Sequence, residues 1–546
     1  MKHRMLFLLW LLCSIHAQAQ KDTTVNPSVT IISSYKPVLI NPAKINFYGS
    51  ALIVDSIHKV RPYNVPAQNF VYSYVPISLH PLSLIHDTAE LYKNTFNFLR
   101  LGYGNYKTPL INGGLFFHPL SSLKINMLVD YISSQGNIVN QDYSVLSART
   151  FAKYFLPNDE IHCNLSYSRN QHFLYGYDHL SYSYAKQEVS HLFQDMDLQL
   201  GIRNTAVNSL NISYDPTIHL NIFHLTDSLR ETTIGCKLPV NFKFNNRIAG
   251  GALASVDATK YSGTNSLSEN IRIKNAVSAF AGFLKYSNKS VLVQLGASYT
   301  QSDTKWSLLP DIRLEIPIHK NNFIFISGWK GTVIKNTYRN LSAINPYLQV
   351  LNIQQNSLQN EFFAGFKTTV GNHFTFLTNA EFVRFSNYPL FMNDTSAASK
   401  FHLFVLSNES KLNNFRIHAD VSYTVRDIFR LTGAVNFNAY SGLHQNQKAW
   451  NMVPMDADFS AFWQASPKLE LKGSFILFSG FKYLNRGNVV KEAEGGTDLR
   501  IAGEYKLYKR MFAFLNLNNI FGKTYERWHL YPVYGINFTG GIKVRF

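Results

Sequence analysis

The sequence predicts an all-β fold, a transmembrane antiparallel β-barrel of about 22 strands with a short extended segment ahead of it. Three observations support this prediction. Residues 1–19 have the pattern of an export leader, the rest of the chain lacks a helix-length apolar run, and from Phe96 onward short segments alternate between apolar and polar residues. Because unpaired backbone groups cannot face lipid, a membrane protein without apolar helices must close its strands into a barrel.

The export leader is recognised by three successive regions. Lys2 and Arg4 supply positive charge, Met5 to Ile15 form an apolar stretch, and Ala17-Gln18-Ala19 is a small-residue cleavage site. The apolar stretch is far shorter than the roughly 20 residues of a spanning helix, which disfavours an N-terminal anchor. We therefore expect export through Sec, cleavage before Gln20 and residence in the outer membrane of a Gram-negative cell.

The composition excludes a large water-exposed surface and a cysteine-built fold. Charged residues make up 16% of the chain, against roughly 25% in soluble proteins. Losing Lys2 and Arg4 with the leader lowers the formal net charge from +18 by two, to +16. In an exported chain this charge points to lipopolysaccharide phosphates or an anionic solute and not to nucleic acid. Only Cys163 and Cys236 remain, too few for a disulfide framework or a cysteine metal site.

The alternation that predicts the barrel is clearest in the last strand. Its apolar side chains occupy every second position: Ile536, Phe538, Ile542, Val544 and Phe546. The residues between them are polar or glycine, and the same split recurs over 123–131, 415–423 and 468–477. We assign the apolar face to lipid and the polar face to the lumen. A soluble β-sandwich or propeller is the alternative, but blade-like repeats are not evident.

The chain divides into three parts. Residues 1–19 are the signal peptide, 20–95 are a proline-rich extended segment, and 96–546 are the barrel. The middle part is too short for a large independent core, so we expect it to fill the lumen like a plug or to follow the periplasmic rim. The connections that look longest are 136–143, 340–359, 440–450 and 485–496.

The C-terminal end of the chain resembles a known family. Residues 518–525 read Asn-Asn-Ile-Phe-Gly-Lys-Thr-Tyr, and the chain finishes on Gly-Gly-Ile-Lys-Val-Arg-Phe. This run is similar to the end of a TonB-dependent receptor barrel, where a turn of this kind follows the penultimate strand. The resemblance implies solute uptake, coupling to TonB, and recognition of Phe546 by the barrel-assembly machinery. The family's receptors carry a folded plug much longer than residues 20–95, so this chain resembles a short, plug-poor variant whose energy coupling stays open.

No motif for a catalytic or cofactor site is present: a phosphate loop, His-Glu-x-x-His and Gly-x-Ser-x-Gly are all missing. We expect no enzyme activity, cofactor or metal. His418 near Asp420 could ligate a metal only with a distant partner, and a hydrated lumen histidine is the alternative. Aromatic residues at strand ends are expected in the membrane-interface girdles: Tyr103, Phe116, Tyr423, Phe481, Trp528 and Tyr531.

The predicted lumen face carries a set of basic side chains: Lys124, Arg203, Arg416, Arg430, Lys468, Lys472, Lys543 and Arg545. One interpretation is a field that admits anionic solutes or holds an acidic plug or partner. The other is pairing with acidic residues on neighbouring strands, namely Asp130, Asp197, Asp420 and Glu470.

Three functions remain open for a monomeric barrel of this kind. The first is receptor-like uptake or passage of a solute. The second is a non-transporting scaffold that docks a surface or periplasmic lipoprotein. The third is a lipid enzyme with a Ser, His and acid cluster at one rim. The expected partners are outer-membrane lipid and lipopolysaccharide, the barrel-assembly machinery, and TonB or a lipoprotein.

Overall fold

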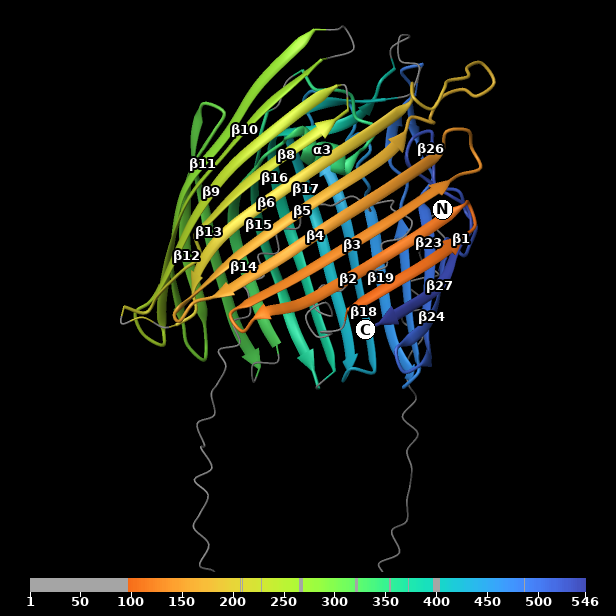
Figure 1. The fold of residues 1–546 in the computed structure, drawn as a ribbon. Coiled ribbons are helices and arrows are strands. Elements are labelled where there is room, and N and C mark those ends of the chain that lie inside the picture. Colours follow the sequence, from red (N-terminus) through yellow and green to blue (C-terminus); the bar gives the residue numbers. More distant parts are fainter. Residues whose placement is uncertain are drawn as a thin grey trace, which may run out of the picture. The chain divides into compact units, whose positions relative to one another are not determined.

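The computed structural model describes residues 97–546 except 207, 209, 227, 265–268, 320–322, 353–354, 372, 396–402 and 486. The predicted leader and the segment 20–95 lie outside the described residues. Antiparallel strands that pair with their chain neighbours form one sheet. This arrangement is the all-β barrel that the alternating sequence predicts (Figure 1).

Twenty-two strands close the barrel. β7 and β8 both pair with β9, so these two segments together act as one strand of the wall. The wall consists of β1 (Phe98–Gly104), β2 (Thr108–Leu120), β3 (Leu123–Gln135), β4 (Asp142–Phe155), β5 (Asp159–Phe173), β6 (Ser190–Asn204), β7 (Ile212–Tyr214), β8 (Thr217–Leu225), β9 (Leu229–Lys243), β10 (Ile248–Thr264), β11 (Asn270–Ser287), β12 (Leu292–Ser302), β13 (Lys305–His319), β14 (Phe323–Ile334), β15 (Ser357–Val370), β16 (Phe374–Asn393), β17 (Phe404–Val425), β18 (Phe429–Ser441), β19 (Met455–Ser466), β20 (Leu469–Phe478), β23 (Gly496–Tyr508), β24 (Met511–Asn518) and β27 (Asn537–Arg545). The predicted strand number is confirmed.

The first and last strands close the ring. β1 pairs with β2 on one side and with β27 on the other, in register from Phe98 opposite Arg545 to Gly104 opposite Thr539. Gly102 faces Gly541 across this seam. Closure removes the two free edges that an open sheet would present to lipid.

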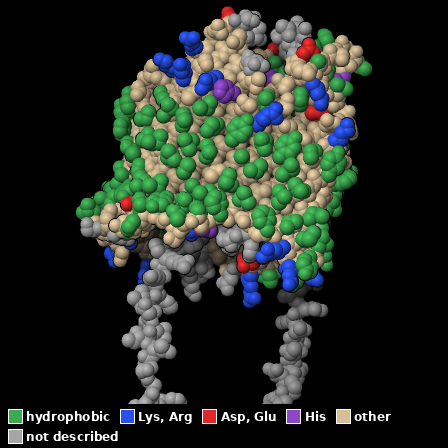
Figure 2. Space-filling model, viewed as in Figure 1, with side chains coloured by type: hydrophobic (Ala, Val, Ile, Leu, Met, Phe, Trp, Pro, Cys, Tyr) green, Lys and Arg blue, Asp and Glu red, His purple; other side chains and the backbone are tan. Residues whose placement is uncertain are grey.

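The outside of the barrel is apolar and the inside is polar. On β27, Phe538 and Ile542 are 47% and 45% exposed, while Thr539 between them is 1% exposed. Figure 2 shows hydrophobic side chains spread over the wall, with lysine and arginine gathered toward its two ends. The lipid and lumen faces predicted from the alternation are therefore correct.

The two ends of the barrel differ. At one end, the turn end, neighbouring strands are joined by tight connections such as 121–122, 467–468 and 509–510. At the other, the loop end, longer connections gather (Figure 1): 174–189, 335–356, 442–454, 479–495 and 519–536. They contain α3 (Tyr338–Ile344), β21 (Lys482–Leu484), β22 (Val490–Glu492), β25 (Glu526–Trp528) and β26 (Tyr531–Pro532). The sequence interpretation missed 174–189 and 519–536 as long connections.

Among the residues that the structure describes, no helix is both long enough and apolar enough to cross a membrane. Cys163 and Cys236 are both free and partly exposed.

A loop cap and an aromatic recess

Five long connections build a cap at the loop end of the barrel; we use the name cap for 174–189, 335–356, 442–454, 479–495 and 519–536 together. Buried side chains from three of these connections (174–189, 335–356 and 519–536) and from the adjoining strand ends form one apolar cluster: Phe173, Leu174, Tyr177, Val189, Phe193, Phe223, Leu225, Leu229, Tyr261, Tyr338, Leu341, Tyr347, Leu348, Leu351, Phe391, Phe404, Trp528 and Tyr531. Since β9 and β10 meet the 519–536 connection in this cluster, the packing spans the mouth of the barrel.

Part of the prediction for the membrane-interface girdles is wrong. Phe481, Trp528 and Tyr531 are 1%, 3% and 1% exposed, because the connections that hold them fold inward. Phe116 lies on the same face of β2 as the buried Asn112, on the lumen side. Tyr103 and Tyr423 do lie on the outer face, 62% and 39% exposed. The presence of an aromatic residue does not by itself distinguish a lipid-facing position from a position packed among loops. An aromatic ring is removed from water in either environment.

Connection 335–356 is anchored to the lumen wall through α3. Thr337 caps the helix, and the Tyr338 backbone N–H donates to the Glu231 carboxylate of β9 at 2.8 Å. Arg339 pairs with Asp195 at 2.8 Å and Asp197 at 3.5 Å, both on β6. These acidic groups are therefore used to hold the helix against the inner wall.

Three tyrosines form the centre of the cap. Tyr347 and Tyr531 stack face to face with ring centroids 3.5 Å apart. Tyr175 meets Tyr531 edge-on at 5.0 Å and donates its hydroxyl to the Pro532 carbonyl at 2.9 Å. Burial raises the pKa of Tyr175 to about 12. The three rings tie connections 174–189, 335–356 and 519–536 to one another.

Connection 442–454 is held by a buried carboxylate. Glu409 is 0% exposed and accepts hydrogen bonds from the backbone N–H groups of His444, Gln445 and Asn446. Asn451 donates to the Phe391 carbonyl at 2.6 Å, which fixes the far end of the same connection. The bonds to the Glu409 carboxylate are charge-assisted, and such bonds are roughly twice as strong as neutral ones.

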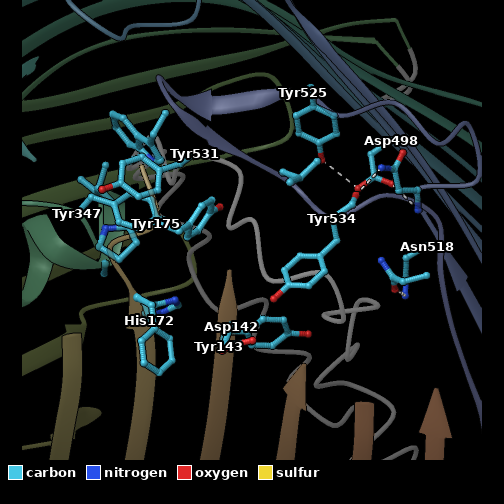
Figure 3. A pocket seen from close by; sticks show the side chains of 18 of the residues that line it. Asp142, Tyr143, His172, Tyr175, Tyr347, Asp498, Asn518, Tyr525, Tyr531 and Tyr534 are labelled. Carbon is cyan, nitrogen blue, oxygen red and sulfur yellow. Dashed lines mark hydrogen bonds between the residues drawn. The ribbon is translucent and has the colours of Figure 1, made fainter. Parts of the chain in front are cut away.

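An aromatic recess lies where the cap meets the lumen face of the wall (Figure 3). It is lined by Asp142, Tyr143, His172, Phe173, Tyr175, Ala343, Ile344, Pro346, Tyr347, Asp498, Arg500, Asn518, Asn519, Tyr525, Trp528, Tyr531, Val533, Tyr534 and Asn537. Rings form one part of the lining. Most of the polar part comes from the ends of β23, β24 and β27, and Asp142 of β4 and His172 of β5 add to it. Concave sites with apolar walls and a few polar groups are typical of small-molecule binding.

The polar part of the recess is organised by Asp498. Its Oδ2 accepts from Arg500 at 2.7 Å and from the Tyr525 hydroxyl at 3.1 Å, and its Oδ1 accepts from the Asn519 backbone N–H at 3.1 Å. Asn518 donates to the Asn537 side chain at 2.8 Å. In the sequence, Asn518 and Asn519 stand out only as the start of the 518–525 run that resembles a receptor turn. Their lumen position at a strand end was the signal that could have marked them.

The structure distributes the predicted basic set along the lumen side of the wall, outside the recess. Lys543 and Arg545 meet at Glu504, at 3.0 and 3.6 Å. Lys472 contacts Glu470 at 2.9 Å, and Arg203 contacts Glu160 at 2.8 Å.

The other four members of the set lie apart from these. Arg416 pairs with Glu381, and the Lys124 ammonium lies 5.2 Å from the Phe155 ring centroid. Arg430 and Lys468 are exposed near the turn end. Apart from the pair at Glu504, the structure does not bring the set together at one place.

His418 and the terminal Phe546 are also placed. His418 is 1% exposed, and its ring contacts Asp420 and Asn436, each at 2.7 Å. Within the described ranges no group of three His, Cys, Asp or Glu side chains is placed to hold a metal ion. Phe546 is 54% exposed, and its backbone N–H donates to the Asn97 carbonyl across the seam.

No protein-family model and no curated protein matches this sequence. Solved structures do match. The FrpB iron transporter from Neisseria meningitidis (F3-3 variant) has a TM-score of 0.64 at 9% identity, with 84% of this chain and 83% of that chain covered. The siderophore receptor PirA from Acinetobacter baumannii has a TM-score of 0.63 at 10% identity, covering 83% and 80%. The copper transporter OprC has a TM-score of 0.60 at 10% identity, covering 83% and 82%. The chain thus has the closed 22-strand barrel fold of the TonB-dependent siderophore and metal receptors.

Proposed function

We propose that this protein is an outer-membrane, receptor-like barrel that captures a solute at its loop end and passes it across the membrane. The observation that supports this most directly is the aromatic recess between the cap and the lumen wall. Similar barrels are described as iron and copper transporters and as a siderophore receptor, which are binding and transport proteins and not enzymes. In this proposal the loop end faces the outside and the turn end faces the periplasm.

The rest of the chain has roles that follow from the proposal. Residues 1–19 direct Sec export, and 20–95 act as a plug-like segment for the lumen of the barrel 96–546. Coupling to TonB would act on that segment. Phe546 serves the barrel-assembly machinery. The lysine and arginine side chains near the two ends of the wall meet lipopolysaccharide or phospholipid phosphates.

The basic side chains on the lumen face give a second, weaker line of support for passage of a solute. Lys472, Lys543 and Arg545 have acidic neighbours at 2.9 to 3.6 Å, so their fields are largely cancelled close to the wall. Lys468 lies exposed near the turn end. A double substitution of Lys468 and Lys472 to glutamine tests the basic field: a shift toward cation selectivity supports it, and unchanged ion selectivity removes it.

A non-transporting scaffold is the second candidate, and the dense packing of the cap favours it. A mouth filled by buried side chains, as the cluster around Tyr347 and Tyr531 is, would suit a surface that docks a lipoprotein. The scaffold predicts stable co-purification with a partner and no conductance in any variant.

Single-channel conductance in planar bilayers separates the two candidates. We compare the mature chain, a chain lacking residues 20–95, and a chain that lacks 20–95 and carries Tyr531→Ala to loosen the cap. Gated passage predicts that the third protein has a large, steady conductance. If all three stay closed although correctly folded, passage is wrong and the scaffold takes its place.

A further inference from the structure

We propose that the aromatic recess binds a neutral ring carrying several hydroxyl groups, that is, a single sugar unit. The inference names the ligand class of the site used in the proposed function, and it rests on that proposal only for its link to transport. The recess combines two unpaired acceptors, an aromatic wall whose hydroxyl groups are largely occupied, and carboxylates that have basic partners.

Two residues that line the recess each have a buried side-chain acceptor without a hydrogen-bond partner. Asn518 and Asn519 are 1% and 3% exposed, and the Oδ1 atom of each is unpartnered. Asn519 donates its Nδ2 to the carbonyls of Lys523 and Tyr534, at 2.8 and 2.7 Å, which fixes the amide orientation and leaves the oxygen facing away from them. A buried acceptor without a partner costs free energy, so a ligand that donates to it is favoured.

The backbone explains why both amides reach the same recess. Consecutive residues of a strand point to opposite faces. Asn519 lies just past the end of β24 and has a φ of 47°, in the left-handed region that asparagine tolerates better than most residues. The chain turns there, and so Asn518 and Asn519 both line the recess.

The aromatic wall offers ring faces and edges more than hydroxyl groups. Tyr175 donates its hydroxyl to the Pro532 carbonyl, Tyr534 donates to the Gln141 carbonyl, and Tyr525 donates to Asp498. Trp528 and Tyr531 complete this side of the lining. The C–H face of a sugar ring is apolar and packs on such rings, while its hydroxyls at the edge supply donors.

The two carboxylates that line the recess, Asp142 and Asp498, each have a basic partner. Asp498 binds Arg500 through two nitrogens, and Asp142 contacts Lys186. Neither a cationic nor an anionic ligand would find an uncompensated partner among these groups, and bringing a charge into a partly dry site is costly. Donor groups without net charge fit best, which favours a hydroxyl-rich ring over an ammonium compound, a phosphate or a carboxylate.

The experiment measures binding of methyl β-D-glucoside and methyl β-D-galactoside to the full mature chain in a sugar-free detergent, by saturation-transfer NMR and by tryptophan fluorescence. Cyclohexanol, tetramethylammonium and inorganic phosphate are the control probes. Monodeoxy versions of the tighter glycoside then remove one hydroxyl at a time. We expect one or two of these to bind about tenfold more weakly, the loss of one hydrogen bond.

Variants locate the site. Asn518→Leu should weaken sugar binding about tenfold or more. Asn379→Leu is the matched control, since Asn379 on β16 also has an unpartnered Oδ1 but does not line the recess. Heat-modifiable migration on gels checks that both variants fold.

Two results would overturn the proposal. One is the absence of glycoside binding to the folded wild-type chain; the other is binding of tetramethylammonium or phosphate at least as tight as that of the glycosides. Equal loss in Asn379→Leu would move the site elsewhere and also reject this assignment. Sugar binding to a barrel that never conducts would leave the ligand class standing and reject only passage.

Discussion

Tyr347 and Tyr531 stack with ring centroids 3.5 Å apart and planes 14° from parallel, although one follows α3 and the other belongs to β26. Neither ring faces lipid, and both are buried. The contact joins two connections that are far apart in the sequence. A substitution at Tyr531 therefore tests how firmly these connections are held together.

Replacing Tyr531 with alanine should open the cap. The change removes the stack with Tyr347 and the edge contact with Tyr175, and a large buried aromatic truncation costs about 3–5 kcal/mol. We expect trypsin to cut connection 335–356 at Lys335 or Arg339 much faster than in the wild type. Tyr103→Ala, on the exposed outer face, should leave the cleavage rate unchanged. Equal protection of both variants would mean that the stack does not hold the cap.

Glu409→Gln should release connection 442–454 without altering the barrel. The amide keeps the shape of the side chain but replaces one acceptor oxygen, so the backbone donors of 444–446 lose charge-assisted partners, at about 2 kcal/mol. Faster tryptic cleavage after Lys448 is the expected readout. Glu492→Gln, whose side chain is 59% exposed, is the control and should change nothing. Slow cleavage in both variants would assign the hold on this connection to other contacts.

The seam between β1 and β27 depends on glycine at one of two adjacent positions. A Cβ at Gly541 would lie 2.0 Å from the Leu101 carbonyl oxygen, whereas at Gly540 its nearest neighbour is 3.5 Å away. We expect Gly541→Ala to destabilise closure by about 3 kcal/mol and to reduce the fraction of heat-modifiable barrel on gels. Gly540→Ala should fold like the wild type. Normal folding of Gly541→Ala would show that the seam can shift to accept the methyl group.

The cap should loosen at high pH. Burial raises the pKa of Tyr175 to about 12, against about 10 in an unfolded chain. The pKa of Tyr175 is higher in the folded state than in the unfolded chain. The contribution of Tyr175 to the stability of the folded cap is therefore fully present below about pH 10 and is lost as the pH rises toward 12. Tryptophan fluorescence, which includes the nearby Trp528, should change in this window and less so in Tyr175→Phe. The same change in both proteins would assign the transition to other groups.

The sequence by itself determined the barrel. Phe538, Ile542 and Val544 alternate with Thr539 and Lys543, and this alternation depends only on the two-residue period of a strand and on the lipid boundary. It can therefore be recognised without knowing which residues are neighbours in the folded protein. The strand number followed from counting such segments. The turn at 518–522 was also visible, with Asn519 and Gly522 taking positive φ in the structure.

Only the tertiary structure decided the cap and the recess. Trp528 and Tyr531 look like girdle residues in sequence, and their burial depends on where connections 335–356 and 174–189 fold, which no local pattern encodes. The unpaired oxygens of Asn518 and Asn519 likewise emerge only when every neighbouring donor has been placed. A strand's two faces are set by local geometry and the surrounding solvent. A recess lined by three connections and several strand ends is set by contacts between residues distant in the chain.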